Sequence, residues 1–185
     1  MVGTLTVQNL QGPTSGANAN KVIIPSGQTI DASAGLFTPS ASQIVQHKHH
    51  YFTVATSHTS SSFTAAHSPM TFTAKHSNSL LRIHVELNVS IDQIVNSTTI
   101  GMIWSVFKDG SNLVSDGQNA IGFYYMDGGA HNNSHINQTS ELYINAGDTS
   151  SHSYQVYTRN SHGTGRVKSD TGWNVPHISI MEIKQ

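Results

Sequence analysis

Residues 80–89 read Leu-Leu-Arg-Ile-His-Val-Glu-Leu-Asn-Val, a segment in which apolar and polar side chains alternate. Successive side chains of a β-strand point to opposite faces, so the apolar residues from Leu81 to Val89 would share one face. Arg82, His84 and Glu86 would then occupy the other face. The pattern predicts a long strand with one face packed against a core, and such a strand needs further strands to pair with it.

Further strand-like runs follow one another from Ser42 onward, with Gly, Asn, Asp and Ser between them. The run 99–108 is nearly continuous apolar sequence, so both of its faces should be covered, and Asp109-Gly110 predicts a tight hairpin turn after it. Residues 91–97 are the one segment in which a helical turn is conceivable. Many short strands with turn residues between them predict a β-sandwich. The other expected strands are 44–54, 63–64, 70–75, 113–114, 120–126, 141–145, 154–159, 166–168 and 177–183.

Residues 1–40 are organised differently. Three short strand-like pieces, at 4–7, 21–24 and 28–31, are separated by turn residues rich in Gly, Pro and Ser. Such a segment cannot bury enough apolar surface to be stable alone. We therefore predict an extended, β-rich N-terminal arm over residues 1–40, wound around two copies of itself, and a sandwich domain over residues 41–185. A flexible tail is the alternative for the arm.

The composition favours an assembly of several chains. Charged residues make up 10% of the chain and hydrophobic residues 36%, with a net charge of −1. Uncharged polar surface on strands suits subunit contacts. Lys and Arg are scattered singly, so a nucleic-acid partner is not expected. No apolar run approaches the roughly 20 residues that span a membrane, so membrane insertion is not expected.

The segment 46–51, Gln-His-Lys-His-His-Tyr, is a histidine cluster. On an alternating strand His47 and His49 project to the same face. Two imidazoles are too few for a closed metal site, but three chains about an axis would supply six. Imidazole suits divalent iron, nickel or zinc. The alternative is that uncharged imidazoles pack or hydrogen-bond across a subunit seam, and no other cofactor is expected.

The chain also resembles a known group of proteins. Residues 3–11, 21–31 and 39–46 resemble openings of tail-fibre-like virion proteins of bacteriophages, with those of cyanophages and other marine phages as the nearest comparison. The part that ends in Ile-Ser-Ile-Met-Glu-Ile is similar to the jelly-roll domain related to the tumour-necrosis-factor and C1q heads. The resemblance implies an all-β, antiparallel jelly-roll sandwich after the arm, assembled as a homotrimer and displayed on a virion. It also implies an axial iron ion held by His47 and His49, since His-x-His pairs hold such an ion in some trimeric phage fibres.

These features lead us to expect a short trimeric tail fibre or spike, made in the host cytoplasm and displayed on the particle. Residues 1–40 would attach to other tail or baseplate proteins, and the head would recognise a saccharide of the host surface. A trimeric capsid decoration or cement protein is the alternative, and a glycan-hydrolysing tail spike is a third possibility. Hydrolysis needs two carboxylates flanking the bond. Because the glutamates fall in strand patterns and most aspartates at turns, an enzyme is not expected.

Two sets of residues are candidates for contacts. Loops on a rigid scaffold carry recognition, which favours residues 127–137 and 160–165 as the receptor-contact loops. Tyr124 and Tyr125 are adjacent and must face opposite ways, so one of them points outward. The outward ring would form a trimer contact or an exposed saccharide-stacking platform, and we favour the trimer contact. The receptor-contact candidates are Asp127, His131, Asn133, His135, Asn160 and His162. The trimer-seam candidates are Tyr51, Tyr124, Tyr125, Tyr157 and Met181.

Overall fold

The computed structural model describes residues 14–16, 43–93, 100–115, 120–126, 134–161, 166–170 and 175–185. The chain divides into two units, Met1–Thr38 and Pro39–Gln185. Most of the predicted arm lies outside the described residues, and the strands that the structure describes belong to the second unit. They are β1 (Ile44–Tyr51), β2 (Thr56–His58), β3 (Thr64–Ala65), β4 (Met70–Thr73), β5 (Leu80–Gln93), β6 (Ile100–Lys108), β7 (Ser111–Asn112), β8 (Gly122–Met126), β9 (Ser134–Asn145), β10 (Ser151–Asn160), β11 (Arg166–Asp170) and β12 (His177–Ile183).

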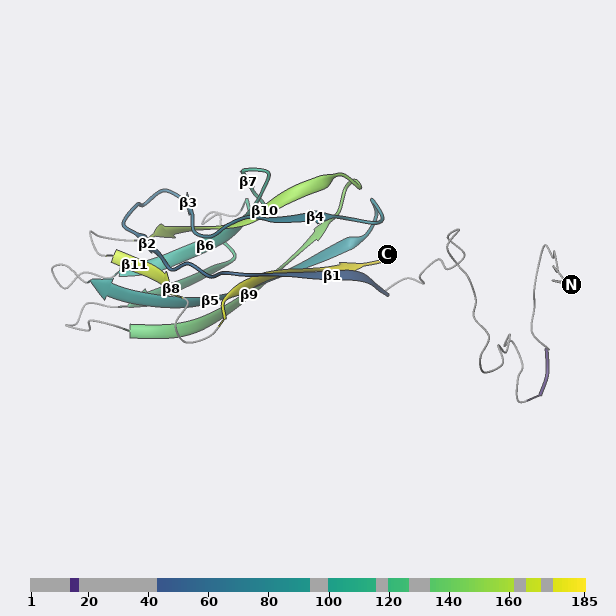
Figure 1. Cartoon of the computed structure of the whole chain (residues 1–185), viewed down its shortest axis with the longest axis horizontal. Coiled ribbons are helices and arrows are strands. Elements are labelled where there is room, and N and C mark those ends of the chain that lie inside the picture. Colours follow the sequence, from purple (N-terminus) through teal and green to yellow (C-terminus); the bar gives the residue numbers. More distant parts are fainter. Residues whose placement is uncertain are drawn as a thin grey trace, which may run out of the picture. The chain divides into compact units, whose positions relative to one another are not determined.

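The strands form two antiparallel sheets that pack face to face (Figure 1). The first sheet has the order β1-β12-β5-β11-β2, with β9 on the other edge of β5. The second has the order β3-β10-β6-β7, with β4 beside β10 and β8 beside β6. The chain crosses from one sheet to the other between β4, β5 and β6, and again between β8, β9, β10 and β11. Repeated crossing of this kind is the connectivity of a jelly roll, which confirms the predicted all-β, antiparallel jelly-roll sandwich.

Strand β5 organises the first sheet. Its alternate apolar residues, from Leu81 to Val89, are buried in the core between the sheets, while Arg82, His84 and Glu86 lie on the outer face. Strand β12 lies between β1 and β5, and its Ile178 and Ile180 side chains are buried in the core. The alternation in the sequence therefore predicts the orientation of β5 correctly, because a one-residue shift would expose every apolar side chain.

Strand β6 occupies the corresponding place in the second sheet. Residues 100–106 are all buried, as the continuous apolar run predicts. Asp109 and Gly110 have φ of 50° and 81°, the left-handed pair of a two-residue hairpin turn. The return strand is 111–112 rather than the expected 113–114. The expected helical turn at 91–97 is wrong for residues 91–93, since β5 continues through them and pairs with β9 and β11.

Large side chains fill the space between the sheets. Trp104 is buried and its indole N–H donates to the Ser140 hydroxyl at 3.1 Å, which joins β6 of one sheet to β9 of the other. A buried indole N–H without a partner would be costly, so this bond fixes how the sheets face each other. The other core side chains include Phe52, Met70, Phe72, Ile83, Val85, Leu87, Met102, Val106, Tyr154, Val156, Ile178 and Ile180.

One carboxylate is buried beside this core. Glu182 of β12 is 0% exposed and accepts bonds from the backbone N–H groups of Lys75 and His76 and from the side-chain amide of Gln46, at 2.6–3.0 Å. Burial opposes ionisation of Glu182, but these donors outweigh it and hold its pKa below the usual value. The carboxylate thereby ties β1 and the segment after β4 to β12.

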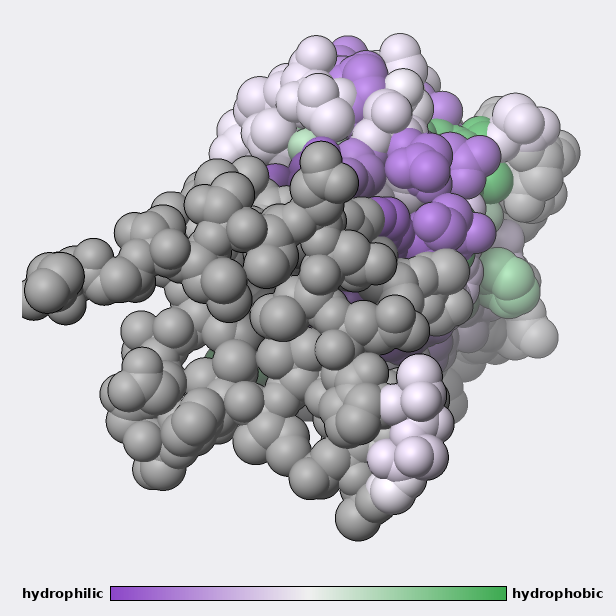
Figure 2. Space-filling model, turned by 90° about the vertical axis from the view of Figure 1, so that its right-hand side faces the viewer, coloured by the Kyte–Doolittle hydropathy of each residue, from purple (hydrophilic) through white to green (hydrophobic). Residues whose placement is uncertain are grey.

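The end of the sandwich at which β12 finishes carries a concentration of strongly hydrophilic residues (Figure 2).

Candidate functional site

The outer face of the first sheet gathers histidines from three strands. Register places His47 beside Met181, His49 beside Ser179 and Glu86 beside His177. We call this surface the histidine face. It includes a hollow of about 220 Å³ that four histidines help to line. The described residues of the face are His47, His49, Tyr51, Arg82, His84, Glu86, Glu141, Tyr143, His177, Ser179 and Met181.

His47 and His49 lie together on this face, as their spacing on a strand predicts. Their ring centroids are 4.1 Å apart with the planes tilted by 55°. Burial, together with the neighbouring His49, Arg82 and His177, lowers the pKa of His47. A lowered pKa favours the neutral imidazole, which is the form that binds metal or packs against another ring. The six-imidazole axial site needs three chains and stays a prediction.

Two of the three Arg and Glu side chains on the histidine face are paired with each other within the chain. Arg82 and Glu141 form an ion pair between β5 and β9, and the Tyr143 hydroxyl donates to the second oxygen of Glu141 at 3.1 Å. The hydrogen bond from Arg82 is the main reason why the pKa of Glu141 falls to about 2. The face consequently presents histidine and tyrosine rings, an internally compensated ion pair and the Glu86 carboxylate, which accepts from the Asn137 amide.

The five trimer-seam candidates do not form one patch. Tyr51 and Met181 lie on the histidine face. Tyr125 lies on the outer face of the second sheet, because its neighbour Tyr124 turns inward to pack against the core. Tyr157 lies on that same outer face, stacked on Phe107 with ring centroids 4.0 Å apart. The structure confirms that Tyr124 and Tyr125 face opposite ways, and it places the seam candidates on both outer faces of the sandwich.

Four receptor-contact candidates, Asp127, His131, Asn133 and His162, lie outside the described residues. His135 is exposed, but it belongs to β9, so the predicted loop at 127–137 is wrong for residues 134–137. That segment continues the pairing of β9 with β5. Asn160 is a second correction: it is 2% exposed and faces the core at the end of β10, so its side chain is not available to a receptor.

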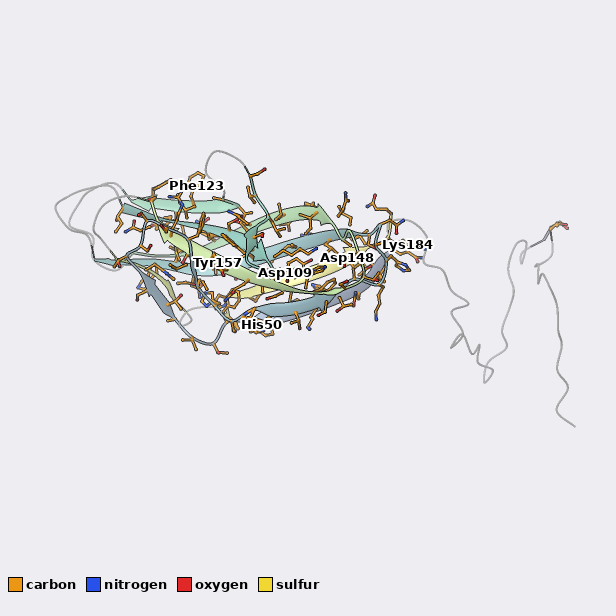
Figure 3. The ribbon with its side chains drawn as sticks, turned by 90° about the horizontal axis from the view of Figure 1, so that it is seen from above. His50, Asp109, Phe123, Asp148, Tyr157 and Lys184 are labelled. Atoms are coloured by element: carbon orange, nitrogen blue, oxygen red, sulfur yellow. The ribbon has the colours of Figure 1, made fainter. Side chains whose placement is uncertain are left out.

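A second hollow, of about 320 Å³, was not anticipated from the sequence. It lies between β8 and β9, and its lining includes Trp104, Phe123, Gln138 and Thr139. Phe123 is 62% exposed, and its ring centroid lies 5.2 Å from that of Tyr125. In Figure 3, Phe123 and His50 lie on opposite sides of the sandwich. The alternation of residues 122–125 places Phe123 outward, but only the fold brings Gln138 beside it.

A further aromatic group lies on the outer face of the second sheet. Phe107 stacks on Tyr157, Phe63 meets Phe107 edge to face at 5.6 Å, and the Arg159 guanidinium lies 5.2 Å from the centre of the Phe63 ring. Together with Phe123 and Tyr125, this group gives the second sheet an outer face with exposed and half-buried rings. We call this surface the aromatic face.

Comparison with known proteins gives remote structural likenesses. No family model and no curated protein matches the sequence. The Eiger TNF structure from S. frugiperda is similar at 12% identity and a TM-score of 0.40, covering 77% of this chain and 95% of that chain. The structure of the T13 IBDV viral particle is similar at 11% identity and a TM-score of 0.33 over 93% of this chain. The structure of infectious bursal disease virus Gx strain is similar at 10% identity and a TM-score of 0.30 over 90% of this chain. This chain covers 43% and 44% of the two viral chains.

Among the described residues, no helix is long and apolar enough to cross a membrane.

Proposed function

We propose that the protein is a structural component of a bacteriophage particle, a short homotrimeric tail fibre that binds a saccharide of the host surface with its jelly-roll head. Residues 1–40 would attach the trimer to tail or baseplate proteins. The sequence resemblance described above supports the viral setting. The observation that carries the binding function is the exposed Phe123 ring beside the hollow that Gln138 and Thr139 line.

The two outer faces suit different roles in such a trimer. The histidine face carries Tyr51, which is 54% exposed, and its Arg82 is paired with Glu141, so covering it with a second subunit removes apolar surface from water. The aromatic face would then point outward. This arrangement keeps Tyr51 and Met181 as seam residues and assigns Tyr125 to the alternative role of a saccharide-stacking platform, which Tyr157 would share on the same face.

The hollow beside Phe123 has the chemistry of a saccharide site. Sugar rings present C–H groups that pack on aromatic faces, and hydroxyl groups that need donors and acceptors. Phe123 supplies the aromatic face, and Gln138 and Thr139 supply an amide and a hydroxyl on the neighbouring strand β9. Each such site would bind weakly, but three sites on one trimer gain avidity when they engage the same polysaccharide.

A binding role fits Glu141 and Glu182 better than hydrolysis does. Glu182 is buried and bonded to backbone amides, and the pKa of Glu141 is about 2, so neither is suited to protonate a glycosidic oxygen near neutral pH. We therefore propose that the head binds its saccharide without cleaving it. A turnover assay on the bound polysaccharide checks this point, and release of reducing ends would contradict it.

The test of binding uses the full chain on an array of bacterial surface polysaccharides. We expect Phe123→Ala to weaken binding to the recognised polysaccharide by roughly 5- to 100-fold, since stacking of a ligand ring on one aromatic side chain is worth about 1–3 kcal/mol in nucleic-acid complexes. Val54→Ala removes an apolar side chain of similar exposure and serves as the matched control. Equal binding by Phe123→Ala and the parent chain would overturn the proposed site. Imaging of labelled particles locates the protein, and a capsid position would favour the decoration protein over the fibre.

A further inference from the structure

We propose that His84, Glu86 and His177 form a binding site for a divalent transition-metal ion that is complete within one chain. One ligand atom from each of the three side chains lies within 4.8 Å of the other two. Two imidazoles and one carboxylate are a ligand set typical of zinc and of non-haem iron. The inference does not rest on the trimer or on saccharide binding.

The backbone of two paired strands fixes this arrangement. His84 and Glu86 are two residues apart on β5, so they project from the same face, and His177 of β12 is the direct cross-strand partner of Glu86. Both strands are internal to the first sheet, with β9 on one side of β5 and β1 beyond β12. Ligands on internal, fully hydrogen-bonded strands are held in position before the ion arrives, which lowers the cost of binding.

Neighbouring groups orient Glu86 and His177, and the Glu141 carboxylate lies beside His84. The Asn137 amide donates to Oε1 of Glu86 at 2.8 Å, and Nδ1 of His177 bonds to the Val175 carbonyl oxygen at 3.3 Å. Nδ1 of His84 lies 3.4 Å from Oε1 of Glu141. Carboxylate and amide partners behind the ligands are the usual means by which proteins fix the orientation of metal-binding imidazoles and carboxylates.

The spacing allows an ion after a small adjustment. Ligand atoms at 2.0–2.1 Å from a tetrahedral zinc ion are about 3.4 Å apart, so separations of up to 4.8 Å must shorten by up to about 1.4 Å. Rotations of the partly buried side chains can supply this without moving the strands. The His49 ring borders the same hollow, with its centroid 5.8 Å from that of His177. The fourth ligand of the ion would therefore be this imidazole or a water molecule.

The predicted stoichiometry separates this site from the axial site at His47 and His49. An ion held by six imidazoles on a threefold axis is shared among three chains, whereas the site proposed here takes one ion per chain. The test is titration of the full chain, without an affinity tag, with Co²⁺ and then Zn²⁺. Visible absorption of bound Co²⁺ reports the coordination, and equilibrium dialysis with elemental analysis counts the ions.

We expect one Co²⁺ per chain, displaced by Zn²⁺, with at least a tenfold loss of affinity in His84→Gln, Glu86→Gln and His177→Gln. Glu86→Gln nearly preserves side-chain shape, so its circular dichroism should match that of the parent chain. The control is His50→Gln, which should bind Co²⁺ as the parent chain does. In the parent chain the His50 ring bonds to the Ser68 hydroxyl. Absence of micromolar binding would overturn the proposal. The proposal would also be overturned if none of the three substitutions changed the affinity for Co²⁺. The same holds if the protein bound one ion per three chains and His47→Gln abolished that binding.

Discussion

The imidazole of His67 lies flat against the ring of Phe52, with ring centroids 4.0 Å apart and planes 7° from parallel. Its Nε2 also bonds to the Ser169 hydroxyl at 2.8 Å, which links the segment between β3 and β4 to β11. Burial is the main reason why the pKa of His67 falls from 6.5 to about 4. The folded state therefore holds this ring neutral, in a place that a charged ring would disrupt.

This burial predicts a loss of stability in acid. Between pH 6.5 and about 4 the unfolded chain binds a proton that the folded His67 does not, so the stability is fully present above pH 6.5 and falls as the pH drops. The full loss of stability from His67 is about 3 kcal/mol. Burial also lowers the pKa of His58, so this residue acts in the same direction. Urea unfolding at pH 7.5 and pH 4.5 measures the loss. His67→Phe keeps a ring against Phe52 and should lose less stability than the parent between these pH values, and a loss as large as the parent's would contradict the assignment.

A second histidine predicts the opposite pH dependence. His152 bridges two carboxylates, with Nδ1 at 2.6 Å from Asp109 and Nε2 at 2.9 Å from Asp148. The bond to Asp109 and then that to Asp148 raise the pKa of His152 above 6.5. Its contribution to stability is fully present below pH 6.5 and is lost as the pH rises through the raised pKa. NMR titration of the ring should give a midpoint above 6.5 that moves down in Asp109→Asn, and a midpoint at or below 6.5 in the parent chain would refute the bridge.

The buried Glu182 predicts a large stability loss from a small change. Glu182→Gln replaces one acceptor oxygen by an amide that faces the N–H groups of Lys75 and His76. When buried N–H donors lose the charged acceptor to which they were bonded, the cost in stability is about 3 kcal/mol. Chemical denaturation should show this loss for Glu182→Gln. Glu141→Gln changes an exposed carboxylate in the same sheet and should cost much less. Equal losses in the two variants would mean that the buried bonds contribute little.

Gly122 predicts a steric effect at the hollow beside Phe123. A Cβ built on Gly122 would overlap the Trp104 indole and approach the Ser140 hydroxyl to 2.5 Å. Gly122→Ala must therefore displace the indole, strain β8 and weaken the bond from Trp104 to Ser140. We expect a loss of about 1–3 kcal/mol and a shifted tryptophan emission. Ala120→Gly, at the start of the same segment, is the control, and unchanged emission in Gly122→Ala would show that the indole has room to accept a methyl group.

Local patterns in the sequence predict much of this fold. The alternation of 80–89 predicts the buried face of β5, and Asp109-Gly110 predicts the hairpin after β6, because both depend on neighbouring residues. The start of β9 is not predictable in this way: three of the four residues of Ser134–Asn137 are polar, and the segment becomes a strand because β5 is long enough to pair with it. The burial of Asn160 likewise follows from the second sheet packing against the first.

The candidate metal site shows the same limit. The cluster at His47 and His49 is visible in the sequence because its members are adjacent. The set of His84, Glu86 and His177 is not visible, since 91 residues separate Glu86 from its cross-strand partner His177. A sheet brings residues together through register, and register between β5 and β12 is a property of the whole fold.

The account depends most on the assembly of three chains through the histidine face. Native mass spectrometry of the tag-free chain at low micromolar concentration measures this directly. We predict a species of three times the 19.9 kDa chain mass, shifted toward single chains by Tyr51→Asp. A folded single chain as the main species under these conditions would contradict the account.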